Sequence, residues 1–226
     1  MNKAQLARIV IADDQELVRT GVRGMLTGEE GLEIVGEAAN GSEAVALCRQ
    51  LRPDLLLTDA RMPVMDGLAA TRAVKQELPD TKVIIITLFE DPNYLFQALK
   101  AGAAGYLLKD ASQRDMLSAI RHVLNGGVLL TPELSMQLMR NLAGTATQTA
   151  APVEPLTKRE REVLELLAQG QTNREIAQRL HVSVGTAKIH VEHIIAKLDA
   201  ADRTNAAVRA FELGLLSAGS HGISAR

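Results

Sequence analysis

Five polar side chains follow four separate apolar runs in the first half of the chain. They are Asp13 and Asp14 after Ile9–Ala12, Asp59 after Leu55–Leu57, Thr87 after Val83–Ile86, and Lys109 after Tyr106–Leu108. Short apolar runs are typical of buried parallel strands. Ligands bind beyond the carboxyl ends of the strands in an open α/β sheet, so we expect three carboxylates, a hydroxyl and an ammonium to converge at one edge.

This set of groups is typical of a phosphoryl-transfer site. Three carboxylates held close together repel one another unless a cation lies between them. Mg2+ is the natural cation, because it takes oxygen ligands together with waters and phosphate oxygens. Lys109 would then pair with the phosphoryl group, and Asp59 would attack phosphorus to form an acyl phosphate. Acidic residues also end strands for purely structural reasons, but that explanation has to account for all five positions at once.

Apolar periodicity arranges these positions in an alternating βα pattern. Strands are expected at residues 8–13, 33–37, 54–59, 82–87 and 104–108. Helices are expected at residues 15–26, 42–51, 67–77, 92–101 and 112–124. Five βα units predict a five-stranded parallel sheet with helices on both faces, which is the doubly wound, flavodoxin-like α/β class.

The composition changes after this pattern. Residues 143–154 are small and polar without an apolar period, which is typical of a flexible tether, and leucines recur at helical spacing in residues 131–142 just before it. We therefore expect four parts. They are the α/β domain at residues 1–130, a helical extension and linker at 131–155, an all-α domain at 156–217, and a disordered tail at 218–226.

Overall composition excludes several classes of protein. A formal net charge of −2 means that nucleic-acid binding must rest on local motifs and not on global charge. No apolar stretch approaches the roughly 18 residues of a membrane span, and no secretory signal opens the chain, so we expect a cytoplasmic protein without a membrane partner. Cys48 is the single cysteine and cannot form an internal disulfide. Nucleotide-binding GxGxxG and GxxxxGK[ST] motifs are also missing.

The first part resembles the receiver domain of bacterial two-component response regulators over about residues 6–126. The resemblance rests on the acidic pair Asp13-Asp14, the segment Thr-Asp59-Ala-Arg-Met-Pro63 followed by Met-Asp-Gly67, Ile-Thr87, and Gly105-Tyr-Leu-Leu-Lys109. It implies that Asp59 accepts a phosphoryl group from a cognate sensor histidine kinase. Mg2+ would be held by Asp14, Asp59 and the backbone carbonyl of Arg61, with Asp13 acting through water. Thr87 and Tyr106 would form a switch that responds to the phosphoryl group.

The all-α part opens with two helix-capping signatures. Thr157 with Glu160, and Thr172 with Glu175, match the capping box, in which a hydroxyl and a carboxylate satisfy the first N–H groups of a helix. A tight turn then leads to Ser183, which is placed to cap a longer helix. Short capped helices joined by a tight turn predict a helix-turn-helix unit.

The longer helix has two faces. Its core face is predicted to carry residues 187, 191, 194 and 198 at helical spacing. On the opposite face, Lys188 can reach guanine or a phosphate, Ile189 can contact a thymine methyl, and Glu192 can accept from cytosine. Thr186 and His193 lie at the edges of this face. A solvated helix face would show the same pattern, so the preceding helix and turn carry the inference.

This part resembles the LuxR-type DNA-binding domain of the NarL/FixJ class over about residues 155–216. The motifs are Leu156-Thr-Lys-Arg-Glu-Arg-Glu-Val163, Thr-Asn-Arg-Glu-Ile-Ala177, Thr186-Ala-Lys188, Lys197-Leu198 and Asp202-Arg-Thr204. The resemblance implies a four-helix domain, with the last helix expected at residues 204–216, that binds double-stranded promoter DNA as a homodimer. The candidate DNA contacts are Thr186, Lys188, Ile189, Glu192, His193 and Lys197. RNA polymerase is a further candidate partner.

The sequence favours a transcription regulator switched by phosphorylation, with catalysis limited to the phosphorylation and dephosphorylation of its own Asp59. Two other classes remain open. An Asp-nucleophile phosphatase would use the same site, but the chain offers no substrate-binding cap or second catalytic acid. A DNA-binding protein with an inert receiver would show no effect of Asp59→Asn.

Overall fold

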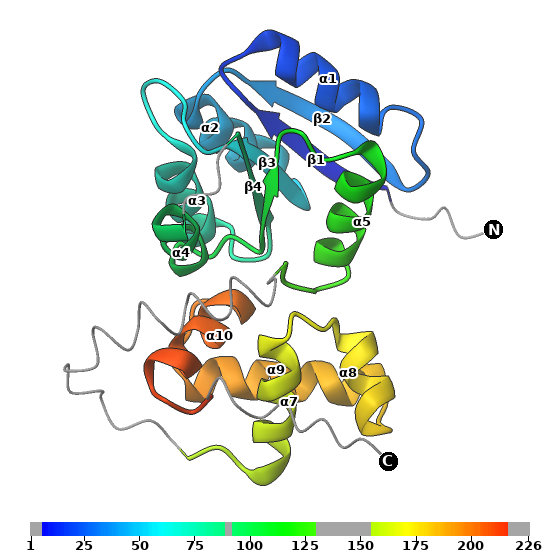
Figure 1. Cartoon of the computed structure of the whole chain (residues 1–226), viewed down its shortest axis with the longest axis vertical. Helices are drawn as coiled ribbons and strands as arrows, with labels where there is room; N and C mark the ends of the chain where they lie inside the picture. The colour runs from blue at the N-terminus through cyan, green and yellow to red at the C-terminus, as the bar shows by residue number, and fades with distance from the viewer. Residues whose placement is uncertain (1–5, 89–91, 130–154, 217–226) are drawn as a thin grey trace. The chain divides into compact units, whose positions relative to one another are not determined.

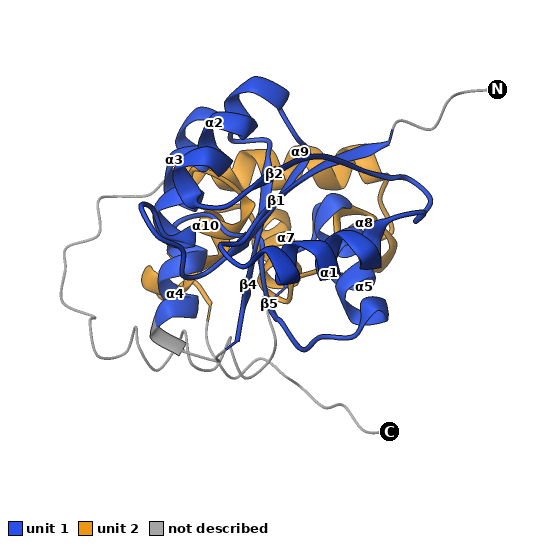
Figure 2. Cartoon of the chain, turned by 90° about the horizontal axis from the view of Figure 1, so that it is seen from above, with its two compact units in different colours: residues 1–129 blue, residues 130–226 orange. Residues whose placement is uncertain are grey.

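The computed structural model describes residues 6–88, 92–129 and 155–216. The chain divides into two compact units, residues 1–129 and residues 130–226 (Figure 2). The helix expected at residues 131–142, most of the linker and the tail from residue 218 lie outside the described residues. The division into four parts therefore stays a prediction.

The first unit is a five-stranded α/β domain. Its elements in chain order are β1 (Ala7–Ala12), α1 (Glu16–Leu26), β2 (Leu32–Ala38), α2 (Gly41–Leu51), β3 (Leu55–Asp59), α3 (Gly67–Glu77), β4 (Lys82–Thr87), α4 (Pro92–Lys100), β5 (Gly105–Leu108) and α5 (Gln113–Leu124). All strand pairs are parallel, in the order β2-β1-β3-β4-β5. The predicted fold class is confirmed, and the predicted ends of these elements agree with the observed ones to within one residue.

The sheet lies between two layers of helices (Figure 1). Successive side chains of a strand point to opposite faces, so Leu55 and Leu57 of β3 pack with α1 and α5, whereas Leu56 packs with α2 and α3. Ile85 of β4 packs against α4. Cys48 is buried on the α2 side, and burial raises the pKa of its thiol to about 12, as suits a packed hydrophobe.

The second unit contains the helices α7 (Lys158–Ala168), α8 (Asn173–Leu180), α9 (Val184–Lys197) and α10 (Arg203–Glu212) within its described residues. Both predicted capping boxes are present, at Thr157 with Glu160 and at Thr172 with Glu175. The Ser183 side chain caps α9 by accepting from the N–H of Thr186. Local sequence therefore determines where three of these helices begin, as predicted.

The last helix is shorter than the sequence suggested. It was expected to run to residue 216, but α10 ends at Glu212. Gly214 adopts a φ of +66°, and the N–H of Leu215 reaches back to the Ala210 carbonyl at 2.9 Å. A glycine in the left-handed conformation with this backward hydrogen bond ends a helix. Leu213, Leu215 and Leu216 still pack on the core, which explains why apolar spacing alone overestimated the length.

Among the described residues, no helix has both the length and the apolar character needed to cross a lipid bilayer.

Candidate functional site

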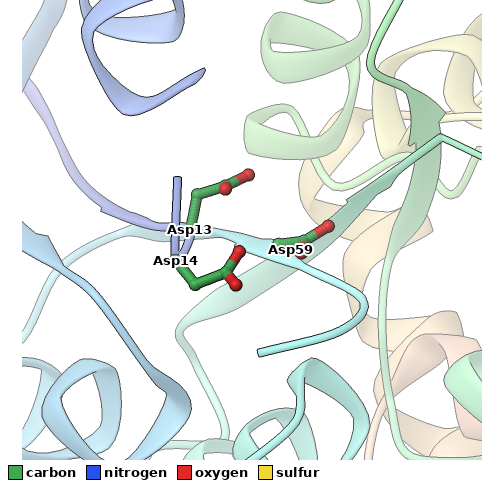
Figure 3. Close-up of side chains that lie close together, drawn as sticks. All are labelled: Asp13, Asp14 and Asp59. Carbon is green, nitrogen blue, oxygen red and sulfur yellow. The ribbon is translucent and has the colours of Figure 1, made fainter. Parts of the chain in front are cut away.

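Three acidic side chains meet at the carboxyl edge of the sheet. Asp13 and Asp14 follow β1, and Asp59 is the last residue of β3, the strand hydrogen-bonded to β1. One carboxylate oxygen from each residue lies within 4.8 Å of the others (Figure 3). Asp13 and Asp59 are buried, whereas Asp14 is exposed. The predicted convergence of these residues is therefore seen in the structure.

Lys109 completes this edge from the turn after β5. Its Nζ lies 2.6 Å from Asp13 Oδ2 and 3.1 Å from Asp59 Oδ1, and all three side chains are buried. Burial raises the pKa of the Asp59 carboxyl, and the Asp13 charge adds to this effect against the opposing influence of Lys109. Burial lowers the pKa of Lys109, but its hydrogen bonds to both carboxylates outweigh that and raise it. Two buried carboxylates thus lie against one ammonium, and a further cation would lower their remaining repulsion.

The donor set fits Mg2+. All three groups are carboxylates, the ligand type that this hard cation prefers, and their oxygens are close enough to surround one ion. Arg61, whose carbonyl was expected to be a further ligand, lies in the loop between β3 and α3 with its side chain exposed. The three carboxylates could hold a divalent cation on the side of the site where Asp14 is exposed to solvent.

Hydrogen bonds hold the loop between β3 and α3. The Ala60 carbonyl accepts from the Gly67 N–H at 3.1 Å and from the Tyr94 hydroxyl at 2.7 Å. The Met65 carbonyl accepts from the Gly41 N–H at 3.0 Å. The loop that follows Asp59 is therefore fastened to α2, α3 and α4 at once.

The two expected switch residues lie on neighbouring strands. Thr87 ends β4 and is buried, and its carbonyl accepts from the Lys109 N–H at 2.7 Å. Tyr106 on β5 is half-buried, is paired in register with Ile85, and packs in the cluster that contains Ala60. Thr87 therefore lies at the carboxyl edge of the sheet, whereas Tyr106 lies nearer the start of the neighbouring strand β5.

In the second unit, α9 presents the surface expected to read DNA. Ala187, Val191, Ile194 and Leu198 are buried in the core, as predicted. Ile189 lies on the opposite side of α9 and is 52% exposed.

The six candidate DNA contacts do not share one environment. Lys188, Glu192 and His193 are exposed, with Lys188 Nζ 3.8 Å from Glu192 Oε1. The Thr186 hydroxyl lies 2.8 Å from that of Ser183 at the helix start. Lys197 differs, because its Nζ lies 2.9 Å from Glu160 Oε2 and its side chain is only 17% exposed. The structure thus brings the other candidates to one helix surface but ties Lys197 to α7.

Three residues make contacts that local sequence patterns did not predict. Arg19 donates to the Asp13 carbonyl, and Tyr94 donates to the carbonyl that follows Asp59. Arg203 of α10 donates to Asn173 Oδ1 at 2.7 Å at the start of α8. Each contact joins separate elements, so only the tertiary structure shows it.

Two family models match the chain. The model of the response regulator receiver domain matches residues 9–121. The model of bacterial regulatory proteins of the luxR family matches residues 154–210.

Similar proteins span nearly the whole chain. The transcriptional regulatory protein LnrK of Bacillus subtilis (strain 168) is 40% identical over 218 residues, which cover 93% of this chain and 99% of LnrK. The response regulator protein VraR of Staphylococcus aureus (strain NCTC 8325 / PS 47) is 38% identical over 209 residues, which cover 92% of this chain and 98% of VraR.

Solved structures agree with these relatives. The receiver domain of the putative response regulator NarL from Mycobacterium tuberculosis is 39% identical, with a TM-score of 0.52 over 54% of this chain and 98% of that structure. The response regulator ChrA of a heme-sensing two-component system is 33% identical, with a TM-score of 0.50 over 93% of this chain and 99% of ChrA. The chain therefore belongs to the response regulators that join a receiver domain to a LuxR-type DNA-binding domain and act in transcription regulation.

Proposed function

We propose that the protein is a transcription regulator that is switched by phosphorylation of Asp59. The observation that carries this proposal is the convergence of Asp13, Asp14 and Asp59 around Lys109 at the carboxyl edge of the sheet. A cognate sensor histidine kinase is the proposed donor. Double-stranded promoter DNA, read by α9, is the proposed target, and RNA polymerase is a further proposed partner.

The reaction needs one nucleophile and charge neutralisation. A carboxylate oxygen of Asp59 forms a bond to phosphorus while the bond from phosphorus to the donor histidine nitrogen breaks, and an acyl phosphate results. Mg2+, held by Asp14, Asp59 and the Arg61 carbonyl with Asp13 acting through water, would neutralise charge on the phosphoryl oxygens. Lys109 supplies an ammonium that can pair with the same oxygens. Catalysis is thus limited to the protein's own phosphorylation and dephosphorylation.

The switch follows from the new charge at Asp59. Phosphorylation adds about −1.5 to −2 charge and three acceptor oxygens. Thr87 ends the neighbouring strand and can donate its hydroxyl to one of those oxygens, and Tyr106 can then follow into the space that Thr87 leaves. Thr87 at the end of β4, which pairs with β3, and Tyr106 on the adjacent strand β5 support this proposal.

Activated protein is proposed to bind DNA as a homodimer. Lys188, Ile189, Glu192 and His193 project from the exposed side of α9, which is 14 residues long and can lie in a major groove. Two such helices in a symmetric dimer would meet half-sites about 10 base pairs apart.

Selection of genomic DNA fragments tests this function. Wild-type protein and Asp59→Asn are each treated with Mg2+ and acetyl phosphate at the same salt concentration, and bound fragments are sequenced. We expect only treated wild-type protein to enrich paired half-sites. Equal enrichment by both proteins would show that the receiver is inert. In a separate assay, turnover of a small phosphoester would favour a phosphatase.

A further inference from the structure

Asp13 is held at several points. Its N–H donates to the Ala38 carbonyl at 3.1 Å, and its Oδ1 accepts from the Gln15 N–H at 2.9 Å. Its Oδ2 lies 2.6 Å from Lys109 Nζ. Its own carbonyl accepts from Arg19 Nη1 at 2.6 Å. Of these contacts, the one from Arg19 comes from a side chain outside the acidic site.

The orientation of the Asp13 carbonyl also sets the position of the Asp14 backbone. That carbonyl belongs to the rigid peptide plane that carries the nitrogen and Cα of Asp14. Within the described part of the chain, no hydrogen bond or ion pair holds the exposed Asp14 carboxylate itself. Its position therefore depends on the backbone, and Arg19 fixes the backbone at that peptide.

Arg19 is itself fixed from the opposite direction. Its side chain is only 17% exposed, and its Nε lies 3.8 Å from Glu37 Oε2 on β2. Glu37 also lies 3.3 Å from the Nε of Arg23, one turn further along α1. A planar guanidinium can serve a carboxylate on one edge and a carbonyl on another, which an ammonium cannot do with the same geometry. Arg19 of α1 thus connects Glu37 of β2 to the backbone of Asp13.

We infer that Arg19 is a positioning residue for the divalent-cation site, holding the Asp13–Asp14 peptide so that both carboxylates face Asp59. This inference rests on the proposed function, since it concerns the same site. Removing a group that orients metal ligands typically lowers metal affinity 10- to 100-fold. Arg19 does not touch the phosphoryl group or the metal in this assignment.

Arg23 provides a matched control. It lies on the same helix and pairs with the same Glu37, but it is 49% exposed and reaches no backbone group of the acidic site in the described structure. Replacing either arginine removes one positive charge from α1 and one partner from Glu37. Only Arg19→Ala also releases the Asp13 carbonyl.

The test is calorimetric titration of Mn2+ and Mg2+ into the full-length wild-type protein, Arg19→Ala, Arg19→Lys and Arg23→Ala. We expect Arg19→Ala to raise the Kd at least about 10-fold. Arg19→Lys should recover part of that loss, because an ammonium can still donate to the carbonyl. Arg23→Ala should stay within about twofold of wild type, which is the effect expected of a distant exposed charge.

Several outcomes separate the two proposals. If wild-type protein binds neither cation, the proposed function fails. If wild type binds and Arg19→Ala binds equally well, only the positioning role is overturned. Equal weakening by Arg19→Ala and Arg23→Ala would also overturn it, because charge alone would then explain the loss. Should Arg19→Ala not fold, as judged by circular dichroism, Arg19→Lys must bind more weakly than Arg23→Ala or the inference fails.

Discussion

Gly67 has no room for a side chain. A Cβ at this position would lie 2.1 Å from the carbonyl oxygen of Asp59 and 3.0 Å from its carbonyl carbon. We expect Gly67→Ala to displace the end of β3, to lower the free energy of unfolding by about 1 to 3 kcal/mol, and to abolish phosphorylation of Asp59. Urea denaturation and acetyl phosphate labelling with Mg2+ measure the two effects.

Gly24 is the control for this prediction. It lies inside α1, and a Cβ there would meet nothing within 4 Å. Gly24→Ala should raise stability by roughly 0.5 to 1 kcal/mol, since alanine loses less backbone entropy in a helix. If acetyl phosphate labelled Gly67→Ala as strongly as it labels the wild-type protein, the contact between residue 67 and the Asp59 carbonyl would not be needed for phosphorylation.

Glu160 makes the stability of the second unit depend on pH. Burial raises the pKa of its carboxyl, but hydrogen bonds from Thr157 and the ammonium of Lys197 outweigh this and lower it to about 2 from an ordinary value of 4.5. A lowered native pKa stabilises the fold above the ordinary value, and this stabilisation is lost as the pH falls through the native pKa. The shift corresponds to at most about 3 kcal/mol.

We expect Glu160→Gln to be less stable than wild type by roughly 2 kcal/mol at pH 7, with the difference shrinking between pH 4.5 and pH 2. Denaturant unfolding, followed by the NMR signals of α9, checks this. Glu165→Gln is the control, because Glu165 lies on the same helix but is exposed. A difference that persists unchanged at pH 2 would contradict the assigned ion pair.

At the scale of elements, α9 carries one lysine that is expected to contact DNA and one that pairs within the domain. Its exposed Lys188 and its paired Lys197 lie on the same helix. We expect Lys188→Ala to reduce by about 1 the slope of log affinity against log salt concentration, as for one lost phosphate contact. Lys197→Ala should leave this slope unchanged and should instead destabilise the domain, because it leaves Glu160 buried without its cation.

Fluorescence anisotropy titrations of labelled duplex DNA at several salt concentrations provide this comparison. A slope reduced equally by Lys197→Ala would show that its ion pair with Glu160 opens on DNA and that Lys197 is a DNA contact, as expected from the sequence.

At the scale of the whole molecule, the regulator must connect its two units. Residues 155–216 have their own hydrophobic core, so the DNA-binding unit can be tested alone. We propose that the unphosphorylated receiver masks either α9, the helix expected to read DNA, or α10, the helix expected to meet a partner subunit, since the chain pairs a receiver domain with a DNA-binding one. We expect residues 152–226 to bind half-site DNA more tightly than the unphosphorylated whole chain. Equal affinities in a gel-shift titration would show that masking is absent.

Local sequence predicted much of this architecture. Apolar strands alternated with helical patterns in β1 to α5, and Thr157, Thr172 and Ser183 predicted the starts of three helices through their own hydroxyls. These signals act within a few residues, so they can be recognised in a single sequence. The end of α10 was predicted too late, because Leu215 kept the apolar spacing while the left-handed Gly214 ended the helix.

By itself, the sequence determined the fold class and the residue types at the acidic edge, because parallel strands deliver their final residues to one edge. Only the tertiary structure decided how those residues are held. Lys109 contacts both Asp13 and Asp59, Arg19 reaches the Asp13 carbonyl from α1, and Lys197 pairs with Glu160 of α7. These contacts join separate elements, and their geometry depends on packing that no local pattern encodes.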